Sequence, residues 1–192
     1  MNAGRFLSLA PLQIAQALVG FGAIAAFTRL MSAEEFGRYA LALSASMAAH
    51  TLLFTWAEAA AFRFFAPARA ERRLRDHYAT LLALVIGLGA AVLIATAALL
   101  LVVGLTHEVA ALSAFAAAAA VFRFLTRITR ESDRAALEIN RFAALETAYI
   151  AIGFAAGVAF LLAADLGAAA PFAGLLAAGV IALLYVLFAA SS

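Results

Sequence analysis

Long stretches without a charged residue separate short charged segments along this chain. No Asp, Glu, Lys or Arg occurs between Arg5 and Arg29, and a helix needs about 20 apolar residues to cross a bilayer. Similar charge-poor stretches predict six membrane-spanning helices, at approximately residues 6–28, 35–61, 78–106, 109–125, 143–164 and 171–189. We therefore expect an all-α fold, in which residues 1–192 form a single polytopic membrane bundle of six transmembrane helices.

The composition argues against a water-soluble enzyme. The chain is 67% hydrophobic and 12% charged, whereas a soluble domain is about 45–50% apolar and about 25% charged. It has no Cys, and the three histidines (His50, His77 and His107) lack metal-ligand spacing. No Gly-rich phosphate loop occurs. We expect no enzymatic activity, no metal, no cofactor and no nucleic-acid partner, and we expect the lipid bilayer to surround the chain.

The arginines predict the orientation of the bundle. All 13 basic residues are arginines, and most fall in two segments, namely Arg63, Arg69, Arg72, Arg73 and Arg75, and Arg123, Arg127, Arg130, Arg134 and Arg141. The positive-inside rule assigns both segments to the cytoplasm, and both termini then lie there too. We expect Pro67 to end the second helix, and the arginine-rich stretch after it to form a short helix on the membrane surface.

Local patterns predict two packing features. Ser32 and Glu35 have the spacing of a capping box, flanked by Met31 and Phe36 as a hydrophobic staple. Capping alone explains these residues, because a cap needs no substrate. Further along, Gly153 and Gly157 form a small-xxx-small pair that permits close contact between helices.

Polar residues inside the second span form the first candidate site. Ser44, Thr51, Thr55 and Glu58 would share one face of a continuous helix, with His50 beside it. Intramembrane ionisable groups favour a substrate or proton path. Hydrogen bonding between helices is the alternative, with Glu58 solvated near the cytoplasmic surface. Gln13 and Gln16 in the first span are similar candidates.

A ladder of arginines forms the second candidate site. On a continuous helix, one stripe would hold Arg123, Arg127, Arg130, Arg134, Glu138 and Arg141. Such a face could receive a phosphate-bearing substrate, because arginine binds phosphate through a bidentate fork. Arg123 would lie deepest in the membrane. The alternative is anchoring with ion pairs from Glu138 to Arg134 and Arg141, on a helix interrupted at Ser132 and Asp133.

The turn after the first span resembles a known family. Phe27 to Ala42 reads FTRLMSAEEFGRYALA, and Arg63 to Pro67 reads RFFAP. This is similar to the N-terminal half of the polysaccharide biosynthesis or O-antigen (Wzx-like) flippases of the MOP exporter superfamily. The matching turn positions include Arg29, Ser32, Glu35, Phe36 and Gly37.

The resemblance implies a function as well as a fold. Members of this family move lipid-linked oligosaccharides, usually on undecaprenyl pyrophosphate, across the bacterial cytoplasmic (inner) membrane. They have two lobes around a hydrophilic cavity, so we expect the six helices to form the N-terminal lobe of an incomplete or half-length member. Partners would then be a second six-helix lobe, or glycosyltransferases or polymerases. The residues expected to bind substrate are Gln13, Gln16, Thr51, Thr55, Glu58, Arg123 and Arg127, with His50 and Glu58 as ion-coupling candidates.

The sequence leaves two alternative functions open. A MATE-like drug or cation exporter of the same superfamily would export cationic dyes in a manner that depends on Glu58. A non-transporting scaffold subunit of a polysaccharide-assembly complex would instead be a dry, close-packed bundle whose polar side chains are paired internally.

Overall fold

The expected all-α fold is confirmed in a computed structural model that describes residues 10–104, 106–135 and 139–191. No strand occurs within these ranges. The elements are α2 (Ala10–Leu30), α3 (Ala33–Leu53), α4 (Thr55–Ala70), α5 (Leu74–Val103), α6 (His107–Ala135), α7 (Ile139–Ala163), the 3-10 turn η1 (Gly167–Ala169) and α8 (Ala170–Ser191).

Several of these helices are long and apolar enough to cross a membrane. Four helical segments meet this criterion among the described residues, namely Leu74–Val103, His107–Ile128, Asn140–Ala163 and Gly167–Tyr185. The pair α3 and α4 meets it as one span bent by 43°, which makes five. The described part of α2 offers only the shorter apolar helix Gln16–Leu30. By length and composition of its helices, the chain is therefore a helical membrane protein. The expected first span, at residues 6–28, lies only partly within the described residues.

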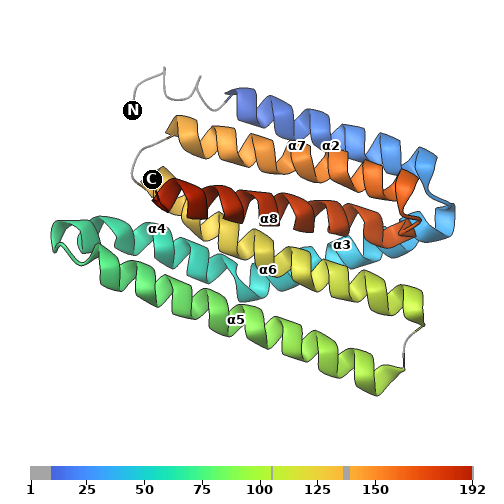
Figure 1. The fold of residues 1–192 in the computed structure, drawn as a ribbon, viewed down its shortest axis with the longest axis horizontal. Coiled ribbons are helices and arrows are strands. Elements are labelled where there is room, and N and C mark those ends of the chain that lie inside the picture. Colours follow the sequence, from blue (N-terminus) through green and yellow to red (C-terminus); the bar gives the residue numbers. More distant parts are fainter. Residues whose placement is uncertain (1–9, 105, 136–138, 192) are drawn as a thin grey trace.

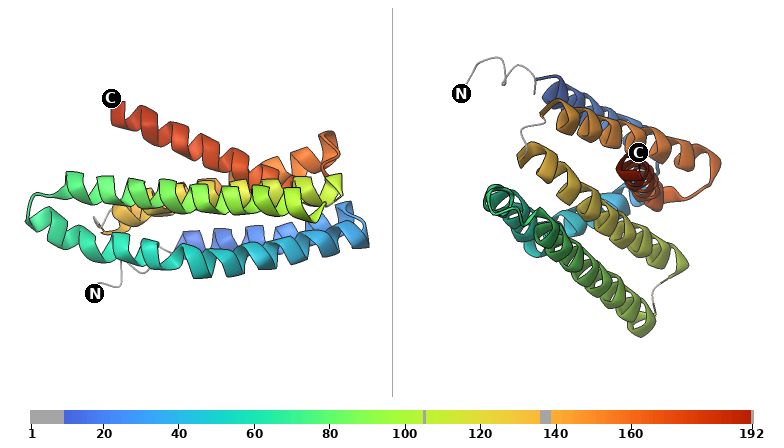
Figure 2. Two further views of the ribbon diagram at one scale, coloured as in Figure 1. Left: turned by 90° about the horizontal axis from the view of Figure 1, so that it is seen from below. Right: turned by 60° about the vertical axis from the view of Figure 1, so that its left-hand side comes forward.

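The helices run side by side, and they alternate in direction when α3 and α4 are taken as one bent span (Figure 1). One end of the bundle holds the start of α2, the turn from α4 to α5, the end of α6, the start of α7 and the end of α8. Both arginine-rich segments therefore gather at that end. Helix α6 is central, since it contacts α3, α4, α5, α7 and α8. The right view of Figure 2 shows it between α5 and α7.

The outside of the bundle is largely apolar. The exposed fraction is 86% for Leu101 and 85% for Val102 on α5, and it is 77% for both Phe21 and Leu52. Exposed apolar surface on this scale is unfavourable in water and expected in contact with lipid.

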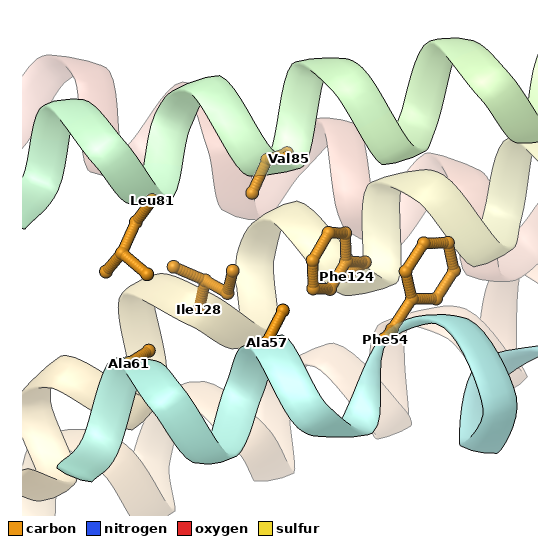
Figure 3. Packing of buried hydrophobic residues seen from close by; sticks show 7 residues of the cluster. All are labelled: Phe54, Ala57, Ala61, Leu81, Val85, Phe124 and Ile128. Carbon is orange, nitrogen blue, oxygen red and sulfur yellow. The ribbon is translucent and has the colours of Figure 1, made fainter. Parts of the chain in front are cut away.

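A compact cluster holds α4, α5 and α6 together (Figure 3). Its members are Phe54, Ala57, Ala61, Leu81, Val85, Phe124 and Ile128. The rings of Phe54 and Phe124 stack with their centroids 4.2 Å apart. Phe54 is also the residue between α3 and α4, so the bend in the second span lies where that span packs against α6.

The expected break at Pro67 is wrong. Pro67 lies inside α4, which continues to Ala70. Pro67 has no backbone N–H to donate to the carbonyl oxygen of Arg63, so α4 continues past it with one hydrogen bond fewer. The turn that follows is closed by Arg72 in a left-handed conformation (φ 57°), and α5 begins at Leu74. The expected surface helix is therefore absent from this described segment.

The expected close contact at Gly153 and Gly157 is confirmed. These glycines of α7 face Gly174 of α8, where an added Cβ would lie 2.3 Å from the backbone nitrogen of Gly157 and 2.4 Å from the carbonyl oxygen of Gly153. The two backbones thus touch, and no side chain fits between them at this point.

Candidate functional site: a cavity between α3, α6 and α8

A cavity of about 280 Å³ opens between α3, α6 and α8. Its lining changes along α6 from alanines at 116, 119 and 120 to arginines at 123 and 127, towards the arginine-rich end. The complete lining is Leu43, Ser46, Met47, His50, Thr51, Ala116, Ala119, Ala120, Arg123, Arg127, Phe172 and Leu175. An apolar chamber thus ends in a polar, cationic wall.

Glu58 forms ion pairs with two residues of the cavity lining, Arg127 and His50, but does not line the cavity itself. The Arg127 Nε lies 3.1 Å from Glu58 Oε2, and the His50 Nε2 lies 3.2 Å from Glu58 Oε1. The Glu58 side chain is only 7% exposed. In a straight helix, eight residues would separate His50 from Glu58 by about 12 Å along the axis. The bend at Phe54 therefore brings the two side chains together.

Arg123 is the arginine available to a ligand. Its side chain is exposed and lines the cavity. Within the described part of the chain it has no ion-pair partner, in contrast to Arg127 and Arg130. An anion or water in the cavity would stabilise the charge of Arg123.

Arg130 lies farther along the same face of α6, outside the residues that line the cavity, and it contacts α7. Its Nη1 lies 3.1 Å from Glu146 Oε2, and its guanidinium lies 4.7 Å from the centre of the Tyr149 ring. Arg130 Nη2 also donates a hydrogen bond to Thr126 Oγ1 at 3.2 Å. Burial lowers the pKa of the Arg130 guanidinium, and the negative charge of Glu146 opposes this shift. This pair joins α6 to α7 and does not face a ligand.

The expected arginine ladder is confirmed only along α6. This helix is not interrupted at Ser132 or Asp133, because it continues to Ala135. Arg123, Arg127 and Arg130 share one stripe of it, since their spacing of four and three residues repeats with the helix. Arg141 belongs to the next helix, α7. Glu138 and the side chain of Arg134 lie outside the described residues. The two expected ion pairs, from Glu138 to Arg134 and to Arg141, therefore lie outside them too.

The expected polar face of the second span is wrong. The bend at Phe54 breaks the helical register, so Ser44, Thr51 and Thr55 are exposed while Glu58 is buried. The three hydroxyls donate to carbonyl oxygens of their own chain, at Ala40 (2.9 Å), Met47 (2.9 Å) and His50 (3.5 Å). Among these three residues, only Thr51 lines the cavity. The alternative of a solvated Glu58 is also wrong, because that carboxylate is buried.

The two glutamines of α2 do not border this cavity. Gln13 is exposed and Gln16 is half-buried, on a helix that packs mainly against α7. Sequence reasoning missed Ser46, which lines the cavity, and Glu146, the partner of Arg130. The spacing of Leu43, Met47 and His50 at successive turns of α3 is the signal that could have indicated the lining.

The turn motif has the expected architecture at the opposite end of the bundle. The Glu35 N–H donates to Ser32 Oγ at 3.2 Å, and the Ser32 N–H donates to Glu35 Oε2 at 2.8 Å, which confirms the capping box. The carboxylate of Glu35 also packs against Gly167, whose φ of +47° and lack of a Cβ make room for it. The other motif positions are Arg29, which is exposed, Phe36, whose ring contacts Tyr39, and Gly37, which has open space beside it.

Arg38 ties this turn to α6. Its guanidinium forms ion pairs with Glu34 in the same helix and with Glu108 at the start of α6. The turn motif therefore serves the packing of helix ends, and it lies away from the arginine wall of the cavity.

Comparisons with models of protein families, with curated proteins and with solved structures find no match for this chain. The geometry defines a class, an all-α membrane bundle with a cation-walled cavity, and the function is inferred from that cavity.

Proposed function

We propose that the chain is one lobe of a flippase that moves lipid-linked oligosaccharides across the bacterial cytoplasmic membrane for cell-surface polysaccharide assembly. The observation that favours this function is the cavity itself, in which arginines end an otherwise apolar chamber within a membrane bundle. A polyprenyl pyrophosphate has the complementary chemistry, with a doubly charged headgroup on an apolar chain.

The two cavity arginines have different roles in this proposal. Arg127 is paired with Glu58 at 3.1 Å, so its charge is largely offset and its guanidinium is held in place at the wall of the cavity. Arg123 has no ion-pair partner among the described residues, and its guanidinium can form a bidentate pair with a phosphate. His50, beside Glu58 on the same wall, positions that carboxylate.

The size of the cavity favours a two-lobed transporter. Its volume of about 280 Å³ is at the lower end of the usual range for small-ligand sites, about 300–1,000 Å³. It has room for the phosphates and little more, so the oligosaccharide would lie against a second lobe. In this arrangement the bundle has six spans, and the arginine-rich end faces the cytoplasm, as the positive-inside rule favours.

Transport in reconstituted vesicles tests the proposal. Vesicles that hold this chain together with a second lobe are expected to move a fluorescent polyprenyl-pyrophosphate oligosaccharide between leaflets faster than protein-free vesicles. Arg123→Gln should abolish the increase, whereas Arg29→Gln, an exposed arginine near the other end of the bundle, should retain it. Wild-type protein without any increase would refute the flippase. Export of cationic dyes that depends on Glu58 would identify a MATE-like exporter instead.

A further inference from the structure

The apolar part of the cavity begins one helical turn from Arg123. Ala119 and Ala120 precede Arg123 on α6 by four and three residues, and all three line the cavity. Residues at this spacing share one face of a helix, and one turn rises about 5.4 Å. A phosphate paired with Arg123 would therefore have these alanines beside the first atoms of whatever is joined to it.

The side chains around these alanines form an apolar chamber. The lining from the other two helices includes Leu43 and Met47 of α3 and Phe172 and Leu175 of α8. The small side chains of α6 leave this space open, whereas a longer side chain at Ala119 would fill it. The alanines also lie near the middle of the span His107–Ile128. Cavities with such linings stay dry and bind apolar ligands.

A sugar ring is poorly matched to this chamber. Each hydroxyl that is buried without a partner costs free energy, and a sugar carries several. The hydroxyl of Thr51 already donates to the carbonyl oxygen of Met47 at 2.9 Å. An isoprene unit needs no polar partner, because it consists only of carbon and hydrogen. The polar side chains of the lining are Ser46, His50, Thr51, Arg123 and Arg127.

We propose that the chamber holds the isoprene unit joined to the phosphate, and that Ala119 keeps the space open for it. This inference rests on the proposed function, since it states which part of a polyprenyl pyrophosphate enters the cavity. Arg123 pairs with the phosphate, and the isoprene unit lies between Ala119, Met47 and Phe172. The sugar stays outside the chamber, so this lobe recognises the lipid carrier and its phosphate.

Isothermal titration calorimetry of the purified full chain in detergent tests the proposal. The ligands are three pyrophosphate monoesters of equal charge: methyl, dimethylallyl (one isoprene unit) and glucosyl pyrophosphate. The wild type is expected to bind the dimethylallyl ester at least about tenfold more tightly than either other ester, because its apolar carbons are buried.

The outcomes separate this inference from the proposed function. Equal affinity for the methyl and dimethylallyl esters, or a preference for the glucosyl ester, would overturn the isoprene site. If binding is then still lost in Arg123→Gln, the phosphate site and the flippase stand. Failure of the wild type to bind any of the three esters would refute both proposals.

A variant that fills the chamber locates the site. Ala119→Leu should lower the affinity for the dimethylallyl ester to that for the methyl ester, while the methyl ester still binds through Arg123. Ala91→Leu changes an exposed alanine of α5 that does not line the cavity, and it should keep the preference. An unchanged preference in Ala119→Leu, or an equal loss in Ala91→Leu, would contradict this placement.

A second variant tests the chamber without adding volume. The side chain of Met47 is 63% exposed, so Met47→Ser should leave the fold intact, and thermal unfolding in detergent checks this for every variant. The preference for the dimethylallyl ester should fall several-fold, because an apolar contact is lost. Leu101→Ser, at an 86% exposed position of α5, should keep it. A full preference in Met47→Ser would show that the isoprene unit lies elsewhere.

Discussion

The contact between the backbones of α7 and α8 makes a quantitative prediction. In Gly174→Ala the new Cβ would lie 2.3 Å from the nitrogen of Gly157 and 2.4 Å from the oxygen of Gly153. Non-bonded heavy atoms prefer about 3.5–4.0 Å, so the two helices must separate by about 1 Å. Overpacking of this kind costs about 1–3 kcal/mol. The atoms in the way are backbone and cannot rotate aside, which favours the upper part of that range.

Alanine also has a higher helix propensity than glycine, by about 1 kcal/mol. The expected net loss in free energy of unfolding is therefore about 2 kcal/mol for Gly174→Ala. The matched control is Gly87→Ala in α5, where nothing lies within 4 Å of an added Cβ; it should be neutral or slightly stabilising. Equilibrium unfolding in mixed micelles measures both variants. If Gly174→Ala were as stable as Gly87→Ala, the close approach of α7 and α8 would be refuted.

Four further variants test other parts of the bundle by the same unfolding assay. Arg130→Leu should lose about 3–5 kcal/mol, because it leaves the Glu146 carboxylate buried without its partner, and the double variant R130L/E146L should recover most of this loss; no recovery would refute a specific pair. Ser32→Ala should cost about 1 kcal/mol by removing the cap of α3, whereas an unchanged stability would show that the cap is dispensable. Arg72→Gly should stabilise the chain by up to about 1 kcal/mol, because glycine adopts a positive φ freely, and a loss of stability would contradict the left-handed turn.

Much of the fold follows from local patterns in the sequence. Charge-poor stretches predict helices α5, α7 and α8 well, because the length of an apolar stretch directly reports its ability to span a bilayer. The capping box at Ser32 and the glycine pair of α7 are also local signals. They were predictable because each depends on residues three or four positions apart.

The bend at Phe54 could not be predicted in the same way. It lies where Phe54 stacks on Phe124, and these two residues are 70 positions apart in the chain. Once the helix bends, the periodicity that placed Thr55 and Glu58 on one face no longer applies. The same dependence on distant partners explains why Glu146 was not recognised as the partner of Arg130. Arg123 and Arg127 were predictable as candidates because both lie on one helix, four residues apart.

Binding of a polyprenyl pyrophosphate to the purified chain most directly tests whether the cavity receives an anionic lipid headgroup. We expect the wild type to bind polyprenyl pyrophosphate at least about tenfold more tightly than the uncharged polyprenol, as one charge-assisted bidentate pair would provide. Arg123→Gln should remove this difference and Arg29→Gln should preserve it. Equal affinity of the wild type for the two lipids would contradict the proposed function.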